Sequence, residues 1–427
     1  MNQELSLEEN LRLAPIPSGG FYQAIIFRAL APMTRGFLEI ELPDGVRKTF
    51  GDSADEIRAH IRIRDARFFQ RCVLFGDIGF GESYVDGDWE TDSIECVIAW
   101  FILNQENSPS QSGARVKHAV IGLLRGWNRL QHLLRPNSVR TSRRNIAEHY
   151  DLGNEFYQLW LDPTMTYSSA LFSSPGQSLE SAQIAKYDAL CRKLRLCEND
   201  RVLEIGSGWG GFASHAAKHF GCRVTTVTIS QAQFDFARER FAREGVADRV
   251  EIRLQDYRAI EGRFDKIASI EMMEALGDEF LETFLAKIHA LLARDGLAGF
   301  QFITVPDSRH DELKRGVDWI QKHIFPGSLL LSIGRVNHAL RCTGDLFLHD
   351  LRDFGSSYAR TLRMWREAFN HQLSSVRALG FDDRFIRKWN YYLSYCEAAF
   401  TMRNISVVQA IYTRPNNRRL TEKETAA

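Results

Sequence analysis

The sequence has no long apolar run and no pair of closely spaced cysteines. The longest apolar stretch, residues 96–103, is about half of the roughly 20 residues that span a bilayer. Seven cysteines are scattered without a CxxC pair, which fits a reducing cytosol better than a disulfide framework. The first residues, MNQELSLEENLRL, are polar and acidic and are not those of a signal peptide. We therefore expect a cytoplasmic protein, either soluble or peripheral on the inner membrane face.

The chain also has no excess of either charge. Its 54 Lys and Arg residues balance 54 Asp and Glu residues, so any polyanionic partner must be recognised by a local patch. A length of 427 residues exceeds what one core usually organises and predicts two domains. With 44% hydrophobic and 25% charged residues, the composition is that of an ordinary globular protein that can bury a core.

One segment, residues 107–147, contains no acidic residue. Its apolar residues Val120, Leu124, Trp127 and Leu134 recur at helical spacing, which predicts a basic amphipathic helix followed by a linker. Its eight basic residues are Arg115, Lys117, Arg125, Arg129, Arg135, Arg140, Arg143 and Arg144. We therefore divide the chain into a small N-terminal α+β domain (1–106), this basic segment (107–147), a catalytic domain (148–414) and a flexible tail (415–427).

The N-terminal domain shows a mixed pattern. Residues 36–42 and 46–50 read as two strands joined by the turn Pro43-Asp44-Gly45. Residues 54–64 have helical character, and residues 76–90 contain too many glycines for a helix interior. These features predict a small α+β domain.

From residue 145 onward, strands and helices alternate. The strands are predicted at 202–205, 223–229, 250–254, 264–270 and 299–305, with helices at 211–219, 231–244 and 280–292. This order predicts a parallel sheet with right-handed crossovers and helices on both faces. After Pro306 we expect helices at 319–325, 358–373 and 389–401 and a late strand at 406–413.

The first strand ends in a glycine-rich turn, VLEIGSGWGGF, at residues 202–212. Glycine lets a ligand approach the backbone closely, and Gly206, Gly208 and Gly211 also satisfy the dinucleotide fingerprint. That fingerprint needs an acid about 20 residues further on, and residues 223–230 contain none. The acid precedes the turn instead, at Glu204. This arrangement resembles the first motif of class I methyltransferases and favours S-adenosylmethionine over a dinucleotide.

Two further segments fall after the next strands of the predicted sheet. Short polar side chains at residues 228–233 (TISQAQ) suit ribose and adenine. In QDYR at residues 255–258, the acid can bind the adenine amino group and the aromatic ring can stack on adenine. Either segment alone could be ordinary cap and loop residues. In register with the glycine turn, both favour an S-adenosylmethionine site.

The stretch HYDLGNEFYQLWLDPTMTYSSALF at residues 149–172 makes the resemblance specific. Together with the motifs above, IFPG (324–327) and YYLSYCEAAF (391–400), it resembles the cyclopropane fatty acid synthase family over residues 145–414. The segment at 76–90 is similar to the leading domain of longer bacterial members. The resemblance implies a class I methyltransferase that transfers a methyl group to cis double bonds of phospholipid acyl chains. The expected cofactor residues are Tyr167, Ser168, Glu204, Gly206, Ser207, Gly208, Gly210, Thr228, Ser230, Gln233, Asp256 and Tyr257.

The resemblance also implies a bound bicarbonate ion that removes a proton as the ring closes, held by a Cys, a Glu, a His and a Tyr. Glu274 and Tyr358 match the Glu and the Tyr, whereas the Cys is Ser169 here and the His is Gln301. Ser and Gln still offer neutral hydrogen bonds, so weaker binding of the ion is expected rather than its loss. The two changes also open an alternative fate of the cation, in which proton loss from a neighbouring carbon gives a methyl-branched or methylene chain.

Two more residues are candidates in the same region. Cys396 matches a cysteine often labelled as the active-site residue of the family, although the chemistry needs no thiol and a lone cysteine in an aromatic helix is usually core. Glu271 lies three residues before Glu274 and could be a second carboxylate near the sulfonium, or a solvated loop acid. No metal is expected.

The remaining expectations concern partners. Anionic lipid attracts Lys and Arg, and Trp127 suits a membrane interface, so residues 115–144 predict contact with an anionic membrane surface. The alternative is a solvated helix that only docks one domain on the other. No nucleic-acid motif accompanies these charges. A homodimer is expected of membrane enzymes of this type. A small-molecule N-methyltransferase and a lipid-binding protein with a vestigial methyltransferase fold are the competing interpretations.

Overall fold

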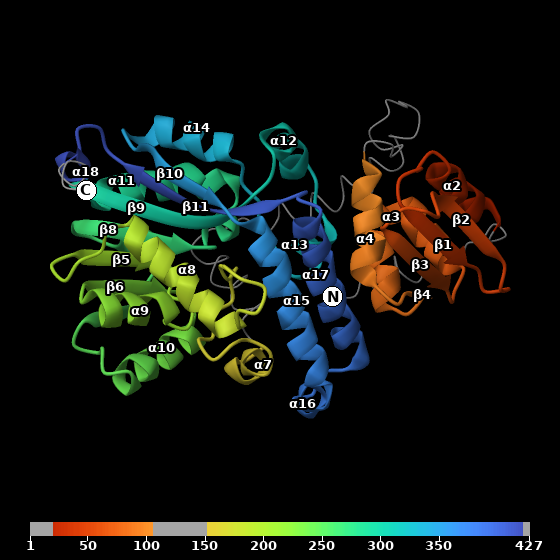
Figure 1. Cartoon of the computed structure of the whole chain (residues 1–427), viewed down its shortest axis with the longest axis horizontal. Coiled ribbons are helices and arrows are strands. Elements are labelled where there is room, and N and C mark those ends of the chain that lie inside the picture. Colours follow the sequence, from red (N-terminus) through yellow and green to blue (C-terminus); the bar gives the residue numbers. More distant parts are fainter. Residues whose placement is uncertain (1–19, 106–151, 422–427) are drawn as a thin grey trace, which may run out of the picture. The chain divides into compact units, whose positions relative to one another are not determined.

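The structure is a computed structural model that describes residues 20–105 and 152–421 (Figure 1). It divides into two compact units, Met1–Leu124 and Arg125–Ala427. The basic segment predicted at 107–147 lies outside the described residues. Within the described ranges, no helix is both long and apolar enough to cross a membrane.

The first unit is a four-stranded sheet with helices. Its elements are α2 (Gly20–Leu30), β1 (Phe37–Glu41), β2 (Arg47–Gly51), β3 (Arg58–Ile63), α3 (Arg67–Val85), β4 (Trp89–Glu90) and α4 (Ile94–Leu103). The strand order is β2-β1-β3-β4, with β1 and β3 parallel. Leu38 and Ile40 on β1 alternate with polar neighbours and are buried, as are Ile61 and Ile63 on β3, so one face of the sheet forms a core.

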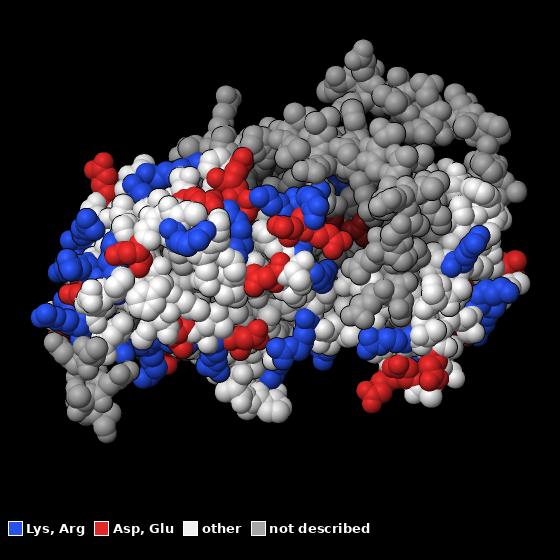
Figure 2. Space-filling view, turned by 90° about the horizontal axis from the view of Figure 1, so that it is seen from above, with Lys and Arg blue, Asp and Glu red and all other residues white. Residues whose placement is uncertain are grey.

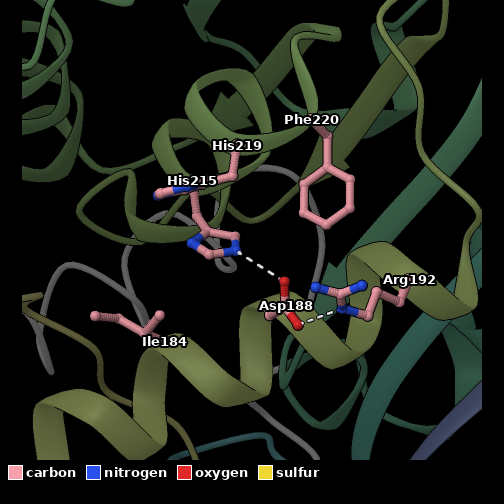
Figure 3. A pocket seen from close by; sticks show the side chains of 6 residues that line it. All are labelled: Ile184, Asp188, Arg192, His215, His219 and Phe220. Atoms are coloured by element: carbon pink, nitrogen blue, oxygen red, sulfur yellow. Dashed lines mark hydrogen bonds and ion pairs between the residues drawn. The ribbon is translucent and has the colours of Figure 1, made fainter.

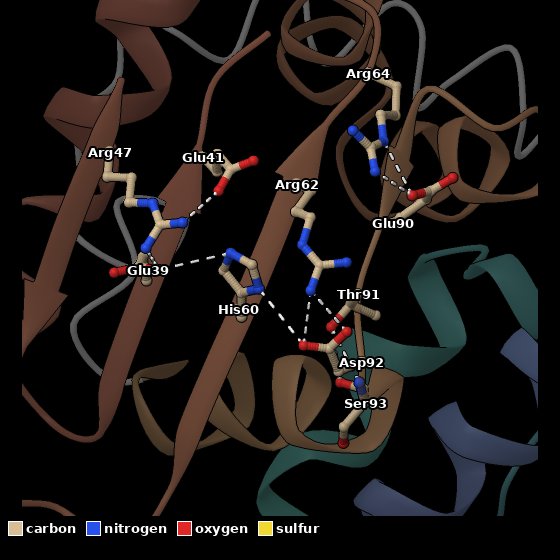
Figure 4. A network of polar contacts seen from close by, with 10 residues as sticks. All are labelled: Glu39, Glu41, Arg47, His60, Arg62, Arg64, Glu90, Thr91, Asp92 and Ser93. Atoms are coloured by element: carbon tan, nitrogen blue, oxygen red, sulfur yellow. Dashed lines mark hydrogen bonds and ion pairs between the residues drawn. The ribbon is translucent and has the colours of Figure 1, made fainter. Parts of the chain in front are cut away.

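The other face of this sheet carries ion pairs (Figure 4). Arg47 pairs with Glu41 at 2.9 Å between nitrogen and oxygen, and Arg62 pairs with Asp92 at 2.8 Å. Both pairs are substantially exposed, and pairs of this kind contribute little to stability. The two-faced pattern agrees with the predicted strands at 36–42 and 46–50 and with the α+β class.

Two local predictions for this unit are wrong. Residues 54–64 contain the strand β3 rather than a helix, because Ala59, Ile61 and Ile63 alternate with polar residues at period two. Residues 76–85 are helical despite their glycines and belong to α3, which kinks at Gly76. At Gly79 a Cβ atom would lie 2.2 Å from the carbonyl oxygen of Arg71, so the glycine permits this close packing.

The second unit is built on a seven-stranded sheet (Figure 1). Its strands are β5 (Arg201–Ile205), β6 (Arg223–Thr228), β7 (Val250–Leu254), β8 (Phe264–Ile270), β9 (Leu292–Thr304), β10 (Phe347–Asp353) and β11 (Ser406–Thr413). The order is β10-β11-β9-β8-β5-β6-β7. The five strands from β9 to β7 are parallel to one another, as predicted. The sheet is not wholly parallel, because β11 pairs antiparallel with β9, and β10 pairs antiparallel with β11.

Helices cover both faces of this sheet. Val202 packs in one core with α8 (Leu179–Lys193), α9 (Gly211–Phe220) and α10 (Gln231–Arg243). Leu203 points to the opposite face and packs in a second core with α11 (Leu281–Leu291) and α14 (Ile333–Thr343). Neighbouring strand residues thus enter different cores, which is why the strand sequences are almost continuously apolar. The α/β fold predicted from the alternating pattern is confirmed.

The remaining described helices lie before β5, between β9 and β11, or after β11 in the chain. They are α7 (Asn154–Gln158), α12 (Asp307–Arg315), α13 (Trp319–His323), α15 (Gly355–His371), α16 (Leu373–Ala378), α17 (Asp383–Thr401) and α18 (Arg418–Thr421). The helices α15 and α17 lie side by side next to the sheet (Figure 1). Three short 3-10 helices are η2 (Tyr257–Ala259), η3 (Met273–Leu276) and η4 (Asp278–Phe280). The segment predicted as a tail includes α18 and the buried Asn417.

Candidate active site

The glycine-rich turn joins β5 to α9 at the carboxyl edge of the parallel strands. Gly206 and Gly210 have φ of 92° and 84°, a left-handed conformation that favours glycine. The backbone N–H groups of Gly206 and Ser207 both donate to the carbonyl oxygen of Val227, at 3.1 and 3.0 Å. These bonds bend the turn over the end of β6. The turn leads directly into the N-terminus of α9, which is an arrangement that binds a ligand through backbone N–H groups.

The other predicted cofactor residues lie at the same edge of the sheet. Thr228 ends β6 and donates to Oε1 of Gln233 at 2.9 Å, and Ser230 caps the N-terminus of α10. Asp256 caps η2 directly after β7. Because β5, β6 and β7 are parallel neighbours, their carboxyl ends bring these side chains to one edge of the sheet.

Two of these residues are already engaged by neighbours. The carboxylate of Asp256 accepts from Arg258 at 2.8–2.9 Å. The ring of Tyr257 packs against Phe284 with centroids 5.4 Å apart and belongs to the core, and burial raises the pKa of its hydroxyl to about 12. A bound adenine would therefore meet Asp256 as part of an ion pair.

Glu204, the acid before the turn, is buried within β5. Its Oε2 accepts a hydrogen bond from Thr226 at 2.6 Å. Desolvation raises the pKa of this carboxyl to about 8, against the lowering effects of the Thr226 hydroxyl and of the positive charges of Lys186 and Arg240. Burial therefore makes the ionised form of Glu204 less stable than that of an exposed carboxyl group.

Tyr167 and Ser168 precede α8 and border an aromatic cluster. The Tyr167 ring lies 5.3 Å from Trp365 and 5.6 Å from Trp160, and its hydroxyl is 2.8 Å from that of Tyr392. Tyr358 extends the cluster, because its ring lies 4.4 Å from Phe400 and 6.2 Å from Trp365. Rings from α15 and α17 thus form one wall next to the loop that carries Tyr167 and Ser168.

Three of the predicted catalytic residues converge on one carboxylate, that of Glu271. Its Oε1 accepts from the backbone N–H of Ser169 at 2.9 Å and from Nε2 of Gln301 at 2.8 Å. Its Oε2 accepts from the hydroxyl of Tyr358 at 2.6 Å. Ser169, Gln301 and Tyr358 come from a loop, from β9 and from α15, so the fold assembles this site from distant segments.

Glu274, which the resemblance places in the ion site, lies near Glu271 but accepts a hydrogen bond from a different segment. It lies in η3, and its Oε1 accepts from the backbone N–H of Ile303 at 2.6 Å. Its Oε2 is buried and has no hydrogen-bond partner among the described residues. Desolvation, together with the nearby charge of Glu271, raises the pKa of Glu274 to about 8. Glu274 is therefore mainly protonated at neutral pH in this state.

Lys186 is a buried cation that the sequence analysis missed. Its Nζ donates to Oγ of Ser168 at 2.7 Å, and Gln183, one turn earlier on α8, donates to the carbonyl oxygen of Ser168 at 2.9 Å. Burial lowers the pKa of Lys186 to about 7, while the negative charges of Glu271, Asp162 and Glu204 oppose the shift. Lys186 lies on the buried apolar face of α8 together with Leu179 and Leu190. A lysine among the apolar positions of a helix is the sequence feature that could have identified it as a functional candidate.

Cys396 lies on α17 near the aromatic wall. Burial raises the pKa of its thiol, and the negative charge of Asp318 adds to the shift. A thiol with a raised pKa is a poor nucleophile, since the reactive form is the thiolate.

A separate pocket of about 480 Å³ lies between α8 and α9 (Figure 3). Its lining residues are Ile184, Asp188, Arg192, His215, His219 and Phe220. Asp188 pairs with Arg192 at 2.6 Å, and burial lowers the pKa of His215 to about 4. None of the predicted site residues lines this pocket. Over residues 20–105 and 152–421, no cluster of three or more His, Cys, Asp or Glu side chains could hold a metal ion.

The doubly covered sheet with a glycine turn at its carboxyl edge defines a class I methyltransferase. Residues 137–410 match the mycolic acid cyclopropane synthetase family, and the chain belongs to that family. The chain is 35% identical over 361 residues to the cyclopropane-fatty-acyl-phospholipid synthase of Escherichia coli, covering 83% of this chain and 88% of the relative. It is 36% identical over 348 residues to the tuberculostearic acid methyltransferase UfaA1 of Mycobacterium tuberculosis, covering 80% and 79%.

Solved structures agree with this assignment. The cyclopropane synthase MmaA2 of Mycobacterium tuberculosis superimposes with a TM-score of 0.59 at 28% identity, over 64% of this chain and 98% of its own. The mycolic acid cyclopropane synthase CmaA1, in a complex with SAH and CTAB, gives the same values. A coclaurine N-methyltransferase has a TM-score of 0.60 over 79% of this chain but only 20% identity, which shows the shared fold alone.

Proposed function

We propose that this protein transfers the methyl group of S-adenosylmethionine to cis double bonds of phospholipid acyl chains and forms cyclopropane fatty acids. The observation that carries the proposal is a carboxylate, Glu271, bonded to Tyr358 of the aromatic wall. Methyl transfer to an alkene leaves a carbocation, which aromatic faces and a nearby negative charge stabilise and which must be shielded from water. An amine substrate would give an ammonium ion, which the same groups also stabilise, so the preference for a C-methyltransferase over a small-molecule N-methyltransferase comes from the relatives that the chain resembles.

The residues at the sheet edge fit S-adenosylmethionine, which supplies an electrophilic methyl group when bound. The left-handed Gly206 and Gly210 set the shape of the turn, an added Cβ at Gly208 would meet no atom within 4 Å, and Thr228, Ser230 and Gln233 offer polar groups beside the turn. The buried Glu204, with a raised pKa, gains stability as an anion when a sulfonium comes near. Because an alkene is a weak nucleophile, the main contribution of these residues is to hold the methyl donor in line with it.

We propose that the reacting carbons are surrounded by Glu274, Tyr358, Ser169, Gln301 and Cys396. Tyr358 keeps its proton, because burial and the neighbouring Glu271 raise its pKa well above the usual value. It therefore acts as a hydrogen-bond donor. Cys396 contributes apolar bulk next to the wall rather than a nucleophile.

The residues present do not fit a bicarbonate ion well. The Ser169 hydroxyl donates to the carbonyl oxygen of Ala170, and Gln301 and Tyr358 donate to Glu271. The side chains that would hold the ion are thus already bonded to this chain's own groups.

A second candidate within the family is a methyl-branching or methylene-forming fatty acyl C-methyltransferase. Ser169 and Gln301 favour it, since they stand where the resemblance places a Cys and a His. The relative with 36% identity is a tuberculostearic acid methyltransferase, which also favours this candidate. The two candidates share the methyl transfer and differ in the fate of the carbocation: the electron pair of the broken C–H bond either closes the three-membered ring or forms a double bond, which leaves a branched or methylene chain.

We also propose that the protein works as a peripheral protein at the cytoplasmic face of the membrane, as a homodimer, with residues 115–144 contacting anionic lipid. On the face shown in Figure 2, acidic and basic side chains are interspersed over the described residues. Each surface Lys or Arg near anionic lipid contributes roughly 1 kcal/mol.

Reversing Arg125 and Arg129 to Glu is expected to weaken binding to anionic vesicles by at least about tenfold, because two attractions become repulsions. Co-sedimentation with phosphatidylglycerol vesicles at low and high salt measures this effect. Lys218→Glu combined with Arg243→Glu, two exposed residues of the second unit, changes the net charge equally and serves as the control. Equal binding by both double variants would mean that the basic segment has no specific role at the membrane.

The proposed function is tested by incubating the protein with methyl-labelled S-adenosylmethionine and vesicles of a cis-unsaturated phospholipid. We expect the label in the acyl chains of the extracted lipid. Vesicles of a saturated phospholipid with the same head group are the control and should remain unlabelled. Transfer to a soluble amine, with none to lipid, would replace the proposal with the N-methyltransferase.

A further inference from the structure

We propose that the Glu271 carboxylate is the proton acceptor of the ring-closing step, so that the reaction needs no bound bicarbonate. This inference rests on the proposed function. It assigns to a side chain of this protein the role that the resemblance gives to an external ion.

Three hydrogen-bond donors surround the carboxylate of Glu271. The Ser169 N–H and Gln301 Nε2 donate to Oε1 of Glu271 at 2.9 and 2.8 Å, and the Tyr358 hydroxyl donates to Oε2 at 2.6 Å. These donors come from three of the four positions at which the resemblance places the ion's ligands. A carboxylate and a bicarbonate present the same pair of oxygens to such donors, so Glu271 satisfies them in place of the ion.

Neighbouring groups fix the orientation of the Gln301 amide, whose nitrogen donates to Glu271. Gln409 donates from Nε2 to Oε1 of Gln301 at 3.1 Å, which turns the Gln301 amide nitrogen toward Glu271. The same Gln409 nitrogen donates to the carbonyl oxygen of Lys186 at 3.2 Å. The amide of Gln301 is thereby held as a donor, and the interaction with Glu271 is built into the packing between β9 and β11.

The backbone of Glu271 is held in an unusual conformation. Its φ is 50°, a left-handed conformation that glycine adopts freely and glutamate does not. Its N–H donates to the carbonyl oxygen of Gln301 at 2.7 Å, which pins the residue at the end of β8. Strained backbone that surrounding contacts hold in place is characteristic of functional sites.

The charge states support a base at this position. Burial raises the pKa of Glu271, although the Tyr358 and Gln301 donors oppose the shift, and a raised pKa makes a carboxylate a stronger base. Burial and the nearby charge of Glu271 raise the pKa of Glu274 to about 8, so Glu274 holds a proton to higher pH than an exposed carboxyl group does. The hydrogen bonds from Tyr358, Gln301 and Ser169 and the positive charge of Lys186 favour the ionised form of Glu271.

The proposed reaction has two steps, methyl transfer and ring closure. The alkene π electrons form a bond to the methyl carbon while the carbon–sulfur bond breaks, which leaves a thioether and a carbocation on the neighbouring carbon. A C–H bond of the new methyl group then breaks. Its electron pair closes the three-membered ring, and its proton passes to Glu271, which becomes a carboxylic acid. The acid releases this proton to solvent before the next turnover.

The test compares wild type, Glu271→Gln and Glu271→Gly in buffer stripped of carbon dioxide, with and without added bicarbonate. We expect wild-type turnover on cis-unsaturated phospholipid vesicles to be unaffected by bicarbonate. Both variants should lose at least about 100-fold, the usual contribution of a general base. Glycine relieves the left-handed strain and vacates the carboxylate position, so added bicarbonate should restore turnover to Glu271→Gly but not to Glu271→Gln.

A second readout does not depend on turnover. We expect ¹³C-bicarbonate to show line broadening with Glu271→Gly and none with wild type, while both proteins bind S-adenosylmethionine equally. Glu279→Gln, an exposed glutamate in the following turn, is the matched control and should behave as wild type. Wild-type turnover that requires bicarbonate, or ion binding by wild type, would overturn the inference. Absence of wild-type methyl transfer to lipid would instead contradict the proposed function, and the binding readout would still test Glu271.

Discussion

Replacing Gly210 with alanine is expected to destabilise the full-length protein by about 2–4 kcal/mol. Gly210 has a φ of 84°, and an added Cβ would lie 2.8 Å from two ring atoms of Phe241 and 3.1 Å from Cβ of Ala237. Both neighbours are buried core residues of α10 and cannot move aside without opening the core. Urea denaturation followed by circular dichroism measures the change.

Gly245→Ala is the matched control for this substitution. Gly245 also has a left-handed φ, of 70°, but no atom lies within 4 Å of the added Cβ. It should lose only the roughly 1–2 kcal/mol of conformational strain. Equal losses for the two variants would mean that the contact with Phe241 does not determine the need for glycine in the cofactor turn.

Replacing Tyr358 with phenylalanine is expected to reduce turnover by about 10- to 100-fold, because a hydrogen bond to a charged group contributes roughly 1.5–3 kcal/mol. The variant leaves Oε2 of Glu271 without its donor at 2.6 Å. That donor lowers the pKa of Glu271, so its removal raises the pKa further. Turnover needs the ionised carboxylate and falls as the pH drops through this pKa. The acidic limb of the pH profile should therefore move to higher pH.

Tyr412→Phe is the control for a lost buried hydroxyl. The Tyr412 hydroxyl is buried and has no hydrogen-bond partner among the residues that the structure describes. Its removal should leave turnover and the pH profile unchanged. A shift of the acidic limb in both variants, or in neither, would contradict the link between Tyr358 and Glu271.

The central strands and the glycine turn could be predicted because several local signals agree there. The apolar strand before the turn and the glycines of the turn itself point to the same element boundary, and β5, β7, β8 and β11 match their predicted ranges closely. Elsewhere the signals conflict. Residues 347–353 form the edge strand β10 although most of their side chains are exposed or polar, and pairing with β11 defines that strand. Pairing of this kind is not visible in the local sequence.

Most residues of the candidate site could be predicted from the sequence, but the central position of Glu271 could not. Ser169, Gln301 and Tyr358 come together, as the resemblance implies, but they meet at Glu271. The resemblance assigns Glu274 to the ion site and leaves Glu271 as a second carboxylate or a solvated loop acid. The structure brings the three donors to Glu271 instead, and its left-handed backbone conformation cannot be anticipated from its residue type.

Mass spectrometry of the acyl chains, after incubation with trideuteromethyl S-adenosylmethionine and cis-unsaturated phospholipid vesicles, tests the central claim most directly. We predict acyl chains that are heavier by one CD₂ unit and that resist mild hydrogenation, as a cyclopropane does. A chain that retains all three deuteriums, or one with a reducible double bond, would identify the branching or methylene-forming reaction instead. Acyl chains without deuterium, from protein that binds the cofactor, would contradict the account.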